Sequence, residues 1–179
     1  RVEEVDTRPT RRNPWPPFTT STLQMEAARK LGFSAAHTMR VAQTLYEAGA
    51  ITYMRTDGVQ MDPSAISAAR VAISDRYSGH YLPEKPRHYE TKAKNAQEAH
   101  EAIRPSNFAA TPANAALEGD DLRLYDLIWK RTMASQMVDA RVLRTTIEIT
   151  ATGVDGEPAV FTASGKAIEF AGFRRASAA

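Results

Sequence analysis

The chain has 179 residues, which is enough for one domain, or for one domain and part of a second. Hydrophobic residues make up 42% of it, which supports a packed core, and a net charge of +2 excludes a polybasic tail. Cysteine is absent, which excludes a disulfide framework and a cysteine zinc site and fits a reducing compartment.

Two further absences bear on location. The sequence contains no apolar run near the roughly 20 residues that span a bilayer. It begins with Arg1 and shows no signal-peptide pattern. We therefore expect a cytoplasmic piece of a longer protein.

The first 18 residues are not expected to be helical. Residues 1–13 are charged and short of apolar side chains, which is typical of a strand or linker from a neighbouring domain. Residues 14–18 contain three prolines, and each proline fixes φ and biases the residue before it towards extended backbone. A stiff opening segment is expected here.

Two short helices are predicted next. Ser21, with Gln24 three residues later, has the spacing of a capping box and predicts the start of a helix that ends at Gly32. Ser34 predicts the start of a second helix that ends at Gly49. Two helices joined so tightly resemble a helix-turn-helix pair.

The middle of the chain alternates extended and helical patterns. Residues 50–54 favour a short strand or an extended piece, and Asp62 before Pro63 predicts a helix that continues to Tyr77. Residues 79–95 favour a loop with several basic side chains.

Three more helices are predicted in the following part of the chain. A short one covers 97–103 and is stopped by Pro105, another opens at Thr111-Pro112, and a long one starts at Asp120 or Asp121 and runs to about residue 137.

The pattern changes near residue 142. Residues 145–150, 159–162 and 166–170 are rich in β-branched or alternating residues and are separated by turn residues. They predict a small β-meander. The fold class expected is therefore α+β, mainly α, with a helical domain at 14–138 and β segments at 1–13 and 139–179.

The segment around Tyr53 carries the first candidate chemistry. In an extended piece, Tyr53, Arg55 and Asp57 share one face. A tyrosine is a poor nucleophile while protonated, and attack on a phosphate needs a cation that stabilises both the tyrosinate and the phosphoryl oxygens. Arg55 supplies such a cation and binds phosphate in bidentate fashion. The alternative is a packed aromatic beside a surface Arg–Asp ion pair.

Three other segments suit phosphate binding. His100 and Arg104 are four residues apart, so a helix would place them on one face as a phosphate clamp; the alternative is a helix tip with ordinary charge pairs. Thr20, Ser21 and Thr22 form a hydroxyl-rich helix N-terminus, which suits an anion, although ordinary capping is more common. A basic loop with interleaved aromatics suits single-stranded nucleic acid, and a solvated loop fits it equally: Lys85, Arg87, His88, Lys92, Lys94, Tyr81 and Tyr89.

Taken together and in this order, the segments PFTTSTLQ, LYEAGAITYMRTD and NAQEAHEAIRP resemble the type IA DNA topoisomerases, of the bacterial topoisomerase I kind. The similarity covers residues 14–138 closely, and the β part between residues 135–137 and 173–175 is also similar. Gly58 departs from the family motif, which often has Ser after the Asp.

The resemblance implies roles for individual residues. Tyr53 matches the nucleophile that forms a 5′-phosphotyrosyl link to one DNA strand, Arg55 the arginine that positions the tyrosine and the phosphate, and His100 a histidine at the cleavage site. Further residues in the same motifs are expected to bind DNA: Thr20, Ser21, Thr22, Asp57, Lys94, Asn95 and Arg104.

The resemblance also implies an architecture and partners. Residues 14–138 match domain III, a winged-helix-like module, and the flanking segments match domain II, a β-rich arch. The family binds Mg²⁺ through an acidic triad in its Toprim domain, and no D-x-D-x-E pattern occurs in this chain, so no metal is expected in it. The expected partners are single-stranded and negatively supercoiled DNA and the Toprim and cleft domains. The chain alone is expected to be inactive.

A purely structural role is one alternative, and the candidate functional residues argue against it for the longer protein but not for this piece. Two other functions are further alternatives. One is a winged-helix DNA-binding module without catalytic activity. The other is a different tyrosine transesterase, such as a site-specific recombinase, in which H-x-x-R precedes the tyrosine. Here the tyrosine comes first and the His–Arg spacing is four, so both features disagree with the recombinases.

Overall fold

The computed structural model describes residues 1–91 and 100–177. The chain divides into two compact units, a sheet unit of residues 1–13 and 139–172 and a helical unit of residues 14–138 and 173–179. Helices together with an antiparallel sheet confirm the α+β fold class.

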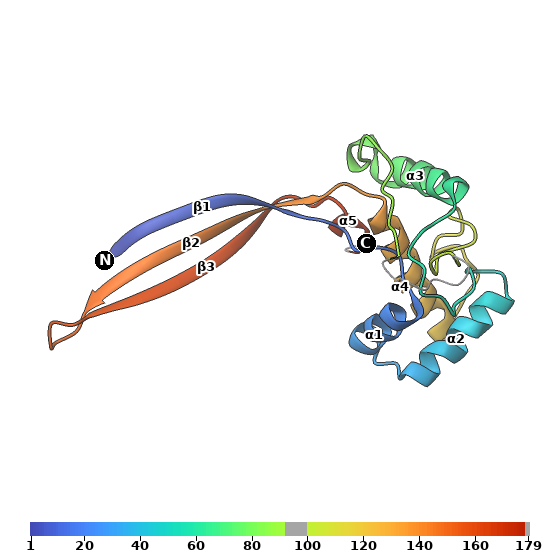
Figure 1. Cartoon of the computed structure of the whole chain (residues 1–179), viewed down its shortest axis with the longest axis horizontal. Helices are drawn as coiled ribbons and strands as arrows, with labels where there is room; N and C mark the ends of the chain where they lie inside the picture. Colours follow the sequence, from blue (N-terminus) through green and yellow to red (C-terminus); the bar gives the residue numbers. More distant parts are fainter. Residues whose placement is uncertain (92–99, 178–179) are drawn as a thin grey trace. The chain divides into compact units, whose positions relative to one another are not determined.

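The sheet unit consists of three antiparallel strands in the order β1-β2-β3 (Figure 1). These are β1 (Val2–Arg12), β2 (Ala140–Thr152) and β3 (Pro158–Phe170). The three β segments predicted between residues 145 and 170 all fall inside strands, but 159–162 and 166–170 belong to one continuous strand, β3, and the strands extend well beyond the predicted segments. The turn between β2 and β3 is closed by Gly153, whose N–H donates to the Glu157 carbonyl at 2.9 Å.

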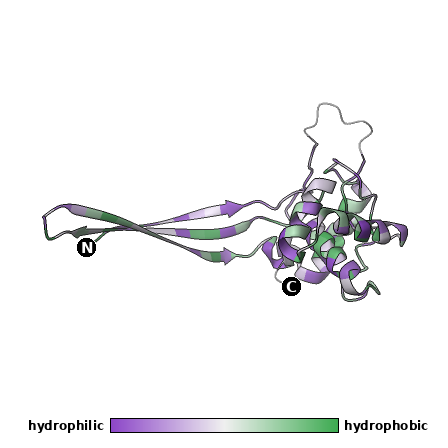
Figure 2. Cartoon of the chain, turned by 90° about the horizontal axis from the view of Figure 1, so that it is seen from below, coloured by the Kyte–Doolittle hydropathy of each residue, from purple (hydrophilic) through white to green (hydrophobic). Residues whose placement is uncertain are grey.

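Cross-strand pairing sorts the side chains of this sheet onto two faces. Val5 pairs with Ile147, which pairs with Ala163. Because successive side chains alternate between faces, the neighbouring row of Glu4, Glu148 and Thr162 lies on the opposite face. Hydrophobic and hydrophilic stretches accordingly alternate along the strands (Figure 2).

The helical unit contains α1 (Thr20–Leu31), α2 (Ala35–Glu47), α3 (Pro63–Tyr77), the 3₁₀ turn η1 (Gly79–Tyr81), α4 (Gly119–Ser135) and α5 (Arg174–Ser177). The predicted cap Ser34 is confirmed, because its side chain accepts the N–H of His37. The predicted cap Asp62 is confirmed in the same way by its bond from Ser64.

The predicted cap of the first helix is wrong by two residues. Thr19, rather than Ser21, is the N-cap, and Thr22, rather than Gln24, completes the capping box. The Thr19 side chain accepts the Thr22 N–H, and the Thr22 hydroxyl accepts the Thr19 N–H. A run of four hydroxyl residues offers several caps at similar spacing, and tertiary contacts of Thr20 select among them.

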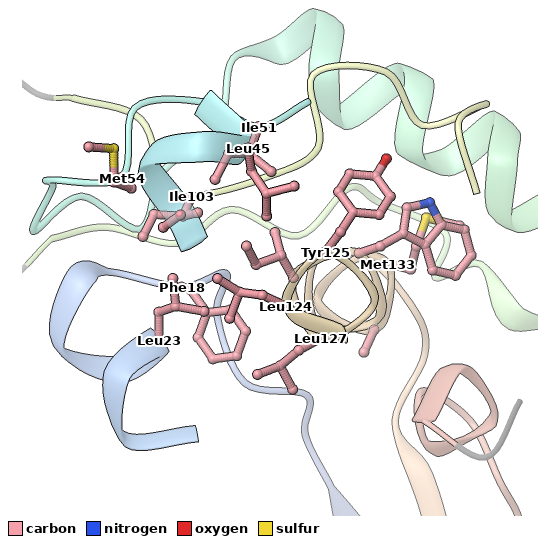
Figure 3. Close-up of a cluster of buried hydrophobic side chains, with 14 of the residues drawn as sticks. Phe18, Leu23, Leu45, Ile51, Met54, Ile103, Leu124, Tyr125, Leu127 and Met133 are labelled. Atoms are coloured by element: carbon pink, nitrogen blue, oxygen red, sulfur yellow. The ribbon is translucent and has the colours of Figure 1, made fainter. Parts of the chain in front are cut away.

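The core of the helical unit gathers around α4. Leu124, Ile128 and Met133 of that helix are fully buried and belong to one cluster with Phe18 and Leu45 from other segments. Figure 3 shows Phe18 and Leu23 on one side of α4 and Leu45 and Ile51 on another. Burial on several sides makes α4 the scaffold that positions the segments near Tyr53.

Two predicted short helices are wrong. Residues 97–99 lie outside the described residues, and 100–105 are extended, with Ile103 bridged to Phe18 and Pro105 to Ile51. The region that begins at Thr111-Pro112 forms turns. Here bonds to distant segments outweigh local helical spacing.

Candidate functional site

Three segments that are far apart in the sequence converge around Tyr53. They cover residues 18–22, 50–60 and 100–106. The Ile103 N–H donates to the Phe18 carbonyl at 2.8 Å, and the Ser106 N–H donates to the Ala50 carbonyl at 3.0 Å. Met54 and Ile103 lie close to Phe18 in the core beneath this site (Figure 3).

Thr52 fastens the chain just before Tyr53. Its N–H donates to the Arg104 carbonyl at 2.9 Å, and its hydroxyl donates to the Ala102 carbonyl at 2.7 Å. The same hydroxyl accepts the Arg104 N–H at 3.0 Å. Three bonds at one residue therefore hold the backbone on the N-terminal side of Tyr53.

Thr20 fastens the chain just after Tyr53. Its hydroxyl donates to the Met54 carbonyl at 2.7 Å and accepts the Thr56 N–H at 2.9 Å. Its own N–H donates to the Thr56 carbonyl at 2.9 Å. The first residue of α1 therefore holds the backbone on both sides of Arg55.

The segment from Tyr53 to Gly58 is bent and belongs to no strand, which corrects the expectation of a strand there. Its burial nevertheless alternates with a period of two. Tyr53, Arg55 and Asp57 are exposed, while Met54 and Thr56 are 1% and 4% exposed. The buried residues anchor the segment, and the three candidate side chains face solvent.

Tyr53 lies between two other rings. The Tyr46 ring meets it edge-to-face with centroids 5.3 Å apart, and the His100 ring lies 6.1 Å away. Tyr53 is 40% exposed, so the rings restrain it without covering it. Within the described part of the chain, no hydrogen bond engages the Tyr53 hydroxyl, and neither a hydrogen bond nor an ion pair engages Arg55.

His100 is brought to Tyr53 through its backbone. The carbonyl of His100 accepts the side-chain amide of Gln60 at 3.3 Å. A Cβ added to Gly58 would overlap this same carbonyl oxygen, so the close approach requires glycine here. Gly58, which stands where the family motif often has Ser, is therefore the residue that packs against the His100 backbone.

Arg104 does not share a helical face with His100, because residues 100–105 are extended. Its guanidinium pairs with Glu101 and donates to the Pro105 carbonyl at 3.0 Å. The side chain is 13% exposed. These bonds hold the guanidinium within the unit, and the expected His100–Arg104 clamp is not formed.

The hydroxyls at the start of α1 are also engaged within the protein. Thr20 bonds to Met54 and Thr56, and Thr22 bonds to Thr19. The Ser21 hydroxyl lies 3.3 Å from that of Thr19. Their expected role in DNA binding stays a prediction, and their observed bonds stabilise the local backbone.

Two side chains of the predicted basic loop bind the helical unit instead of facing a ligand. The Arg87 side chain donates to the Met137 carbonyl at 2.8 Å, and the Tyr89 hydroxyl donates to the Ser135 carbonyl at 2.9 Å. Both bonds tie the loop to the end of α4. Lys92, Lys94 and Asn95 lie outside the described residues.

Sequence reasoning missed Tyr46 and Thr52. Tyr46 lies seven residues before Tyr53, and only the turn after α2, with Gly49 at a φ of 72°, brings the rings together. In the sequence, Thr52 is only one of several β-branched residues, and its hydrogen-bond partners lie about 50 positions further along the chain. Neither contact leaves a local signal in the sequence.

The described residues hold no group of three or more His, Cys, Asp or Glu side chains that could bind a metal ion. No helix within residues 1–91 or 100–177 is long and apolar enough to cross a membrane. The chemistry that the site itself offers is therefore that of an exposed phenol, a free guanidinium and an imidazole.

Comparison with known proteins bears on this chemistry. A family profile described as DNA topoisomerase matches residues 1–179. DNA topoisomerase 1 of Zymomonas mobilis is 61% identical over 173 residues, which cover 96% of this chain and 14% of that protein. DNA topoisomerase 1 of Streptomyces coelicolor is 54% identical, over 98% of this chain and 18% of that protein.

A solved structure agrees. The full-length topoisomerase I from Thermotoga maritima superposes with a TM-score of 0.84 at 36% identity, over 99% of this chain and 29% of that one. The chain therefore spans less than a third of the length of each of these relatives.

Proposed function

Since the chain belongs to the DNA topoisomerase family, we propose that it carries the DNA-cleaving tyrosine of a type IA enzyme. The whole protein would relax negatively supercoiled DNA. It would cleave one strand, pass another strand through the gap and reseal the first. The chain by itself, without a metal-binding domain, would neither cleave nor relax DNA.

The observation that carries this proposal is the setting of Tyr53. Its phenol is 40% exposed, lies beside His100 and is fastened on both sides, by Thr52 and by Thr20. An exposed side chain on a rigidly held backbone is what an enzyme needs to present a nucleophile to a large substrate.

The reaction proposed is a transesterification. The Tyr53 phenolic oxygen attacks a backbone phosphorus, the bond from phosphorus to the 3′-oxygen breaks, and that oxygen takes up a proton. A 5′-phosphotyrosyl bond replaces the phosphodiester, so the number of phosphoester bonds is unchanged and no ATP is required. The reverse reaction reseals the strand.

Arg55 and His100 would act on the same phosphate. Arg55 has no partner among the described residues, so it is available to bind the phosphoryl oxygens as negative charge develops on them. His100, next to the Tyr53 ring, would contact the DNA beside the scissile bond. Asp57, exposed on the same segment, would line the path of the strand.

The Mg²⁺ that the family implies finds no ligand set in the described residues, so we assign no step of this chemistry to a metal held by this chain. We place its ligands in the Toprim domain of the whole protein. That domain, the cleft-closing domain and single-stranded or negatively supercoiled DNA are the proposed partners, in the cytoplasm and on the nucleoid.

The domain names follow from the same proposal. Residues 14–138 would be domain III, with a winged-helix-like arrangement suggested by the tight α1–α2 pair. Residues 1–13 and 139–179 would belong to domain II. The division of the chain into a helical and a sheet unit supports these assignments, although residues 173–179 group with the helical unit.

A chimera tests the proposal. This chain would replace the matching segment of the Zymomonas mobilis relative, and relaxation of a negatively supercoiled plasmid would be measured with Mg²⁺. We expect relaxation by the chimera, none by its Tyr53→Phe variant and none by the chain alone. Relaxation by the Tyr53→Phe chimera would instead favour a DNA-binding module without catalytic activity.

A further inference from the structure

Three cations form one row across the sheet unit. In the observed register, Arg8 of β1 pairs with Arg144 of β2, and Arg144 pairs with Lys166 of β3. Residues paired directly across antiparallel strands project from the same face. All three side chains are exposed, so the row lies on the surface.

This row costs folding stability. Like charges directly opposite each other in a sheet destabilise it, because the Cβ atoms of such pairs are only about 5 Å apart. A cost of this kind suggests that the cations serve a partner.

Internal carboxylates neutralise only one end of the row. Asp6, two residues along β1, pairs with Arg8 at 2.7 Å. Among the residues that the structure describes, neither Arg144 nor Lys166 has an ion-pair partner. The row therefore presents two unpaired cations from its central and outer strands.

The spacing of the row fits a nucleic-acid backbone. Neighbouring strands are about 4.8 Å apart, so three side chains span roughly 10 Å. A DNA backbone carries one negative charge per nucleotide, so a row of this length faces consecutive backbone phosphates. We propose that Arg8, Arg144 and Lys166 form a second DNA-binding surface, which contacts backbone phosphates independently of Tyr53.

Phosphate contacts position DNA without reading its bases, so this surface should show no sequence preference. Each cation neutralises one phosphate and releases a counterion, which makes binding dependent on salt. Family membership names DNA as the substrate; this inference adds where on the sheet unit a strand is held. It does not depend on which residue performs the cleavage.

The test combines DNA affinity with sheet stability. Binding of the 179-residue chain to a fluorescein-labelled oligonucleotide would be measured against salt, and unfolding would be followed by circular dichroism. We expect Arg144→Gln and Lys166→Gln each to weaken binding several-fold and to lower the salt slope by about one. Both should raise the denaturation midpoint, because they remove repulsion.

Arg144→Glu is the sharper variant. It places a carboxylate between two cations, so it should stabilise the sheet further while it abolishes most of the binding through this surface. A role in packing alone would lower the midpoint. Lys30→Gln, which removes an equal charge from α1, is the control and should leave the oligonucleotide affinity within twofold. Unchanged affinity and salt slope in Arg144→Glu would overturn the proposal.

Discussion

The Thr20 hydroxyl lies 2.7 Å from the carbonyl oxygen of Met54, and through this bond the first turn of α1 holds the backbone that follows Tyr53. The same hydroxyl accepts the N–H of Thr56. Thr20 belongs to the hydroxyl-rich helix N-terminus that the sequence indicated as an anion site. In the structure its hydroxyl instead holds the backbone next to Tyr53, the proposed nucleophile. The bond also explains why Thr19 rather than Ser21 caps α1, because Thr20 is already committed.

Thr20→Val should slow DNA cleavage by the chimera. The substitution keeps the shape and removes the bonds to Met54 and Thr56, and displacement of a reacting group by about 1 Å can cost roughly 100-fold in rate. We expect a 10- to 100-fold lower single-turnover rate constant for oligonucleotide cleavage, with most activity restored in Thr20→Ser. The rate constant separates misplacement from misfolding, since unfolded protein lowers only the amplitude.

The control for that experiment is Thr132→Val. Thr132 is buried, whereas Thr20 is half-buried, and the Thr132 hydroxyl donates to the Ile128 carbonyl within α4. Thr132→Val should lose about as much folding stability as Thr20→Val, while the rate constant for DNA cleavage stays unchanged. Equal rate constants for Thr20→Val and the unsubstituted chimera would show that the bonds of Thr20 to Met54 and Thr56 do not position the site.

Gly58→Ala should disturb both stability and the placement of His100. The added Cβ would overlap the His100 carbonyl oxygen, a backbone atom that cannot rotate away, and would also crowd the Thr56 hydroxyl. Overpacking of this kind costs about 1–3 kcal/mol of unfolding free energy, which urea denaturation measures. Gly79→Ala meets no atom within 4 Å and is the matched control. A Gly58→Ala chain as stable as the control would contradict the steric account.

The contact between α2 and α4 should depend on pH through Asp120. Hydrogen bonds from His37 and Arg123 hold the pKa of Asp120 below its ordinary value of 3.8. A lowered pKa in the folded state means that the stabilisation is complete above about pH 4 and is lost as the pH falls through the folded-state pKa.

We therefore expect Asp120→Asn to lower the urea midpoint at pH 6 and to flatten the fall in stability below pH 4. Asp121→Asn removes a carboxylate from the same turn and leaves the contact between His37 and Asp120 intact. This variant should therefore keep the fall in stability below pH 4. An unchanged acid slope in Asp120→Asn would rule out this pair as its source.

The Tyr125 phenol should ionise late in an alkaline titration. Burial raises the pKa of Tyr125 from 10.0 to about 12. The stabilisation that results from this raised pKa is complete below pH 10 and is lost as the pH rises through 12. Phenolate absorbance during an alkaline titration should show one late step that Tyr125→Phe removes. Ionisation of every phenol near pH 10 in the folded chain would contradict its burial.

The sequence predicted the elements whose signals are local. The caps Ser34 and Asp62, and the apolar spacing of α3 and α4, depend on residues within a few positions of each other, and these helices form where expected. The segment at 97–103 had helical spacing too. Its described part is extended because the Ile103 N–H bonds to Phe18, a residue that no local pattern connects with it.

The candidate site was predictable in composition but not in arrangement. The spacing of Tyr53, Arg55 and Asp57 predicted a shared face, and all three are exposed in the structure, while Met54 and Thr56 between them are buried. The contacts of Tyr46 and Thr52, and the retention of Arg104 by Glu101, depend on how distant segments meet. Pairing between distant segments is decided by the whole core, so single-residue spacing could not reveal it.

The central claim is that the Tyr53 oxygen attacks DNA, and the direct measurement is peptide mapping of the trapped covalent adduct. The active chimera would be denatured during cleavage of an oligonucleotide, digested and analysed by mass spectrometry. We predict a nucleotide joined through its 5′-phosphate to the peptide that contains Tyr53, and no adduct in Tyr53→Phe. A nucleotide attached to Tyr46, whose ring is only 5.3 Å away, or an adduct that survives in Tyr53→Phe, would contradict the account.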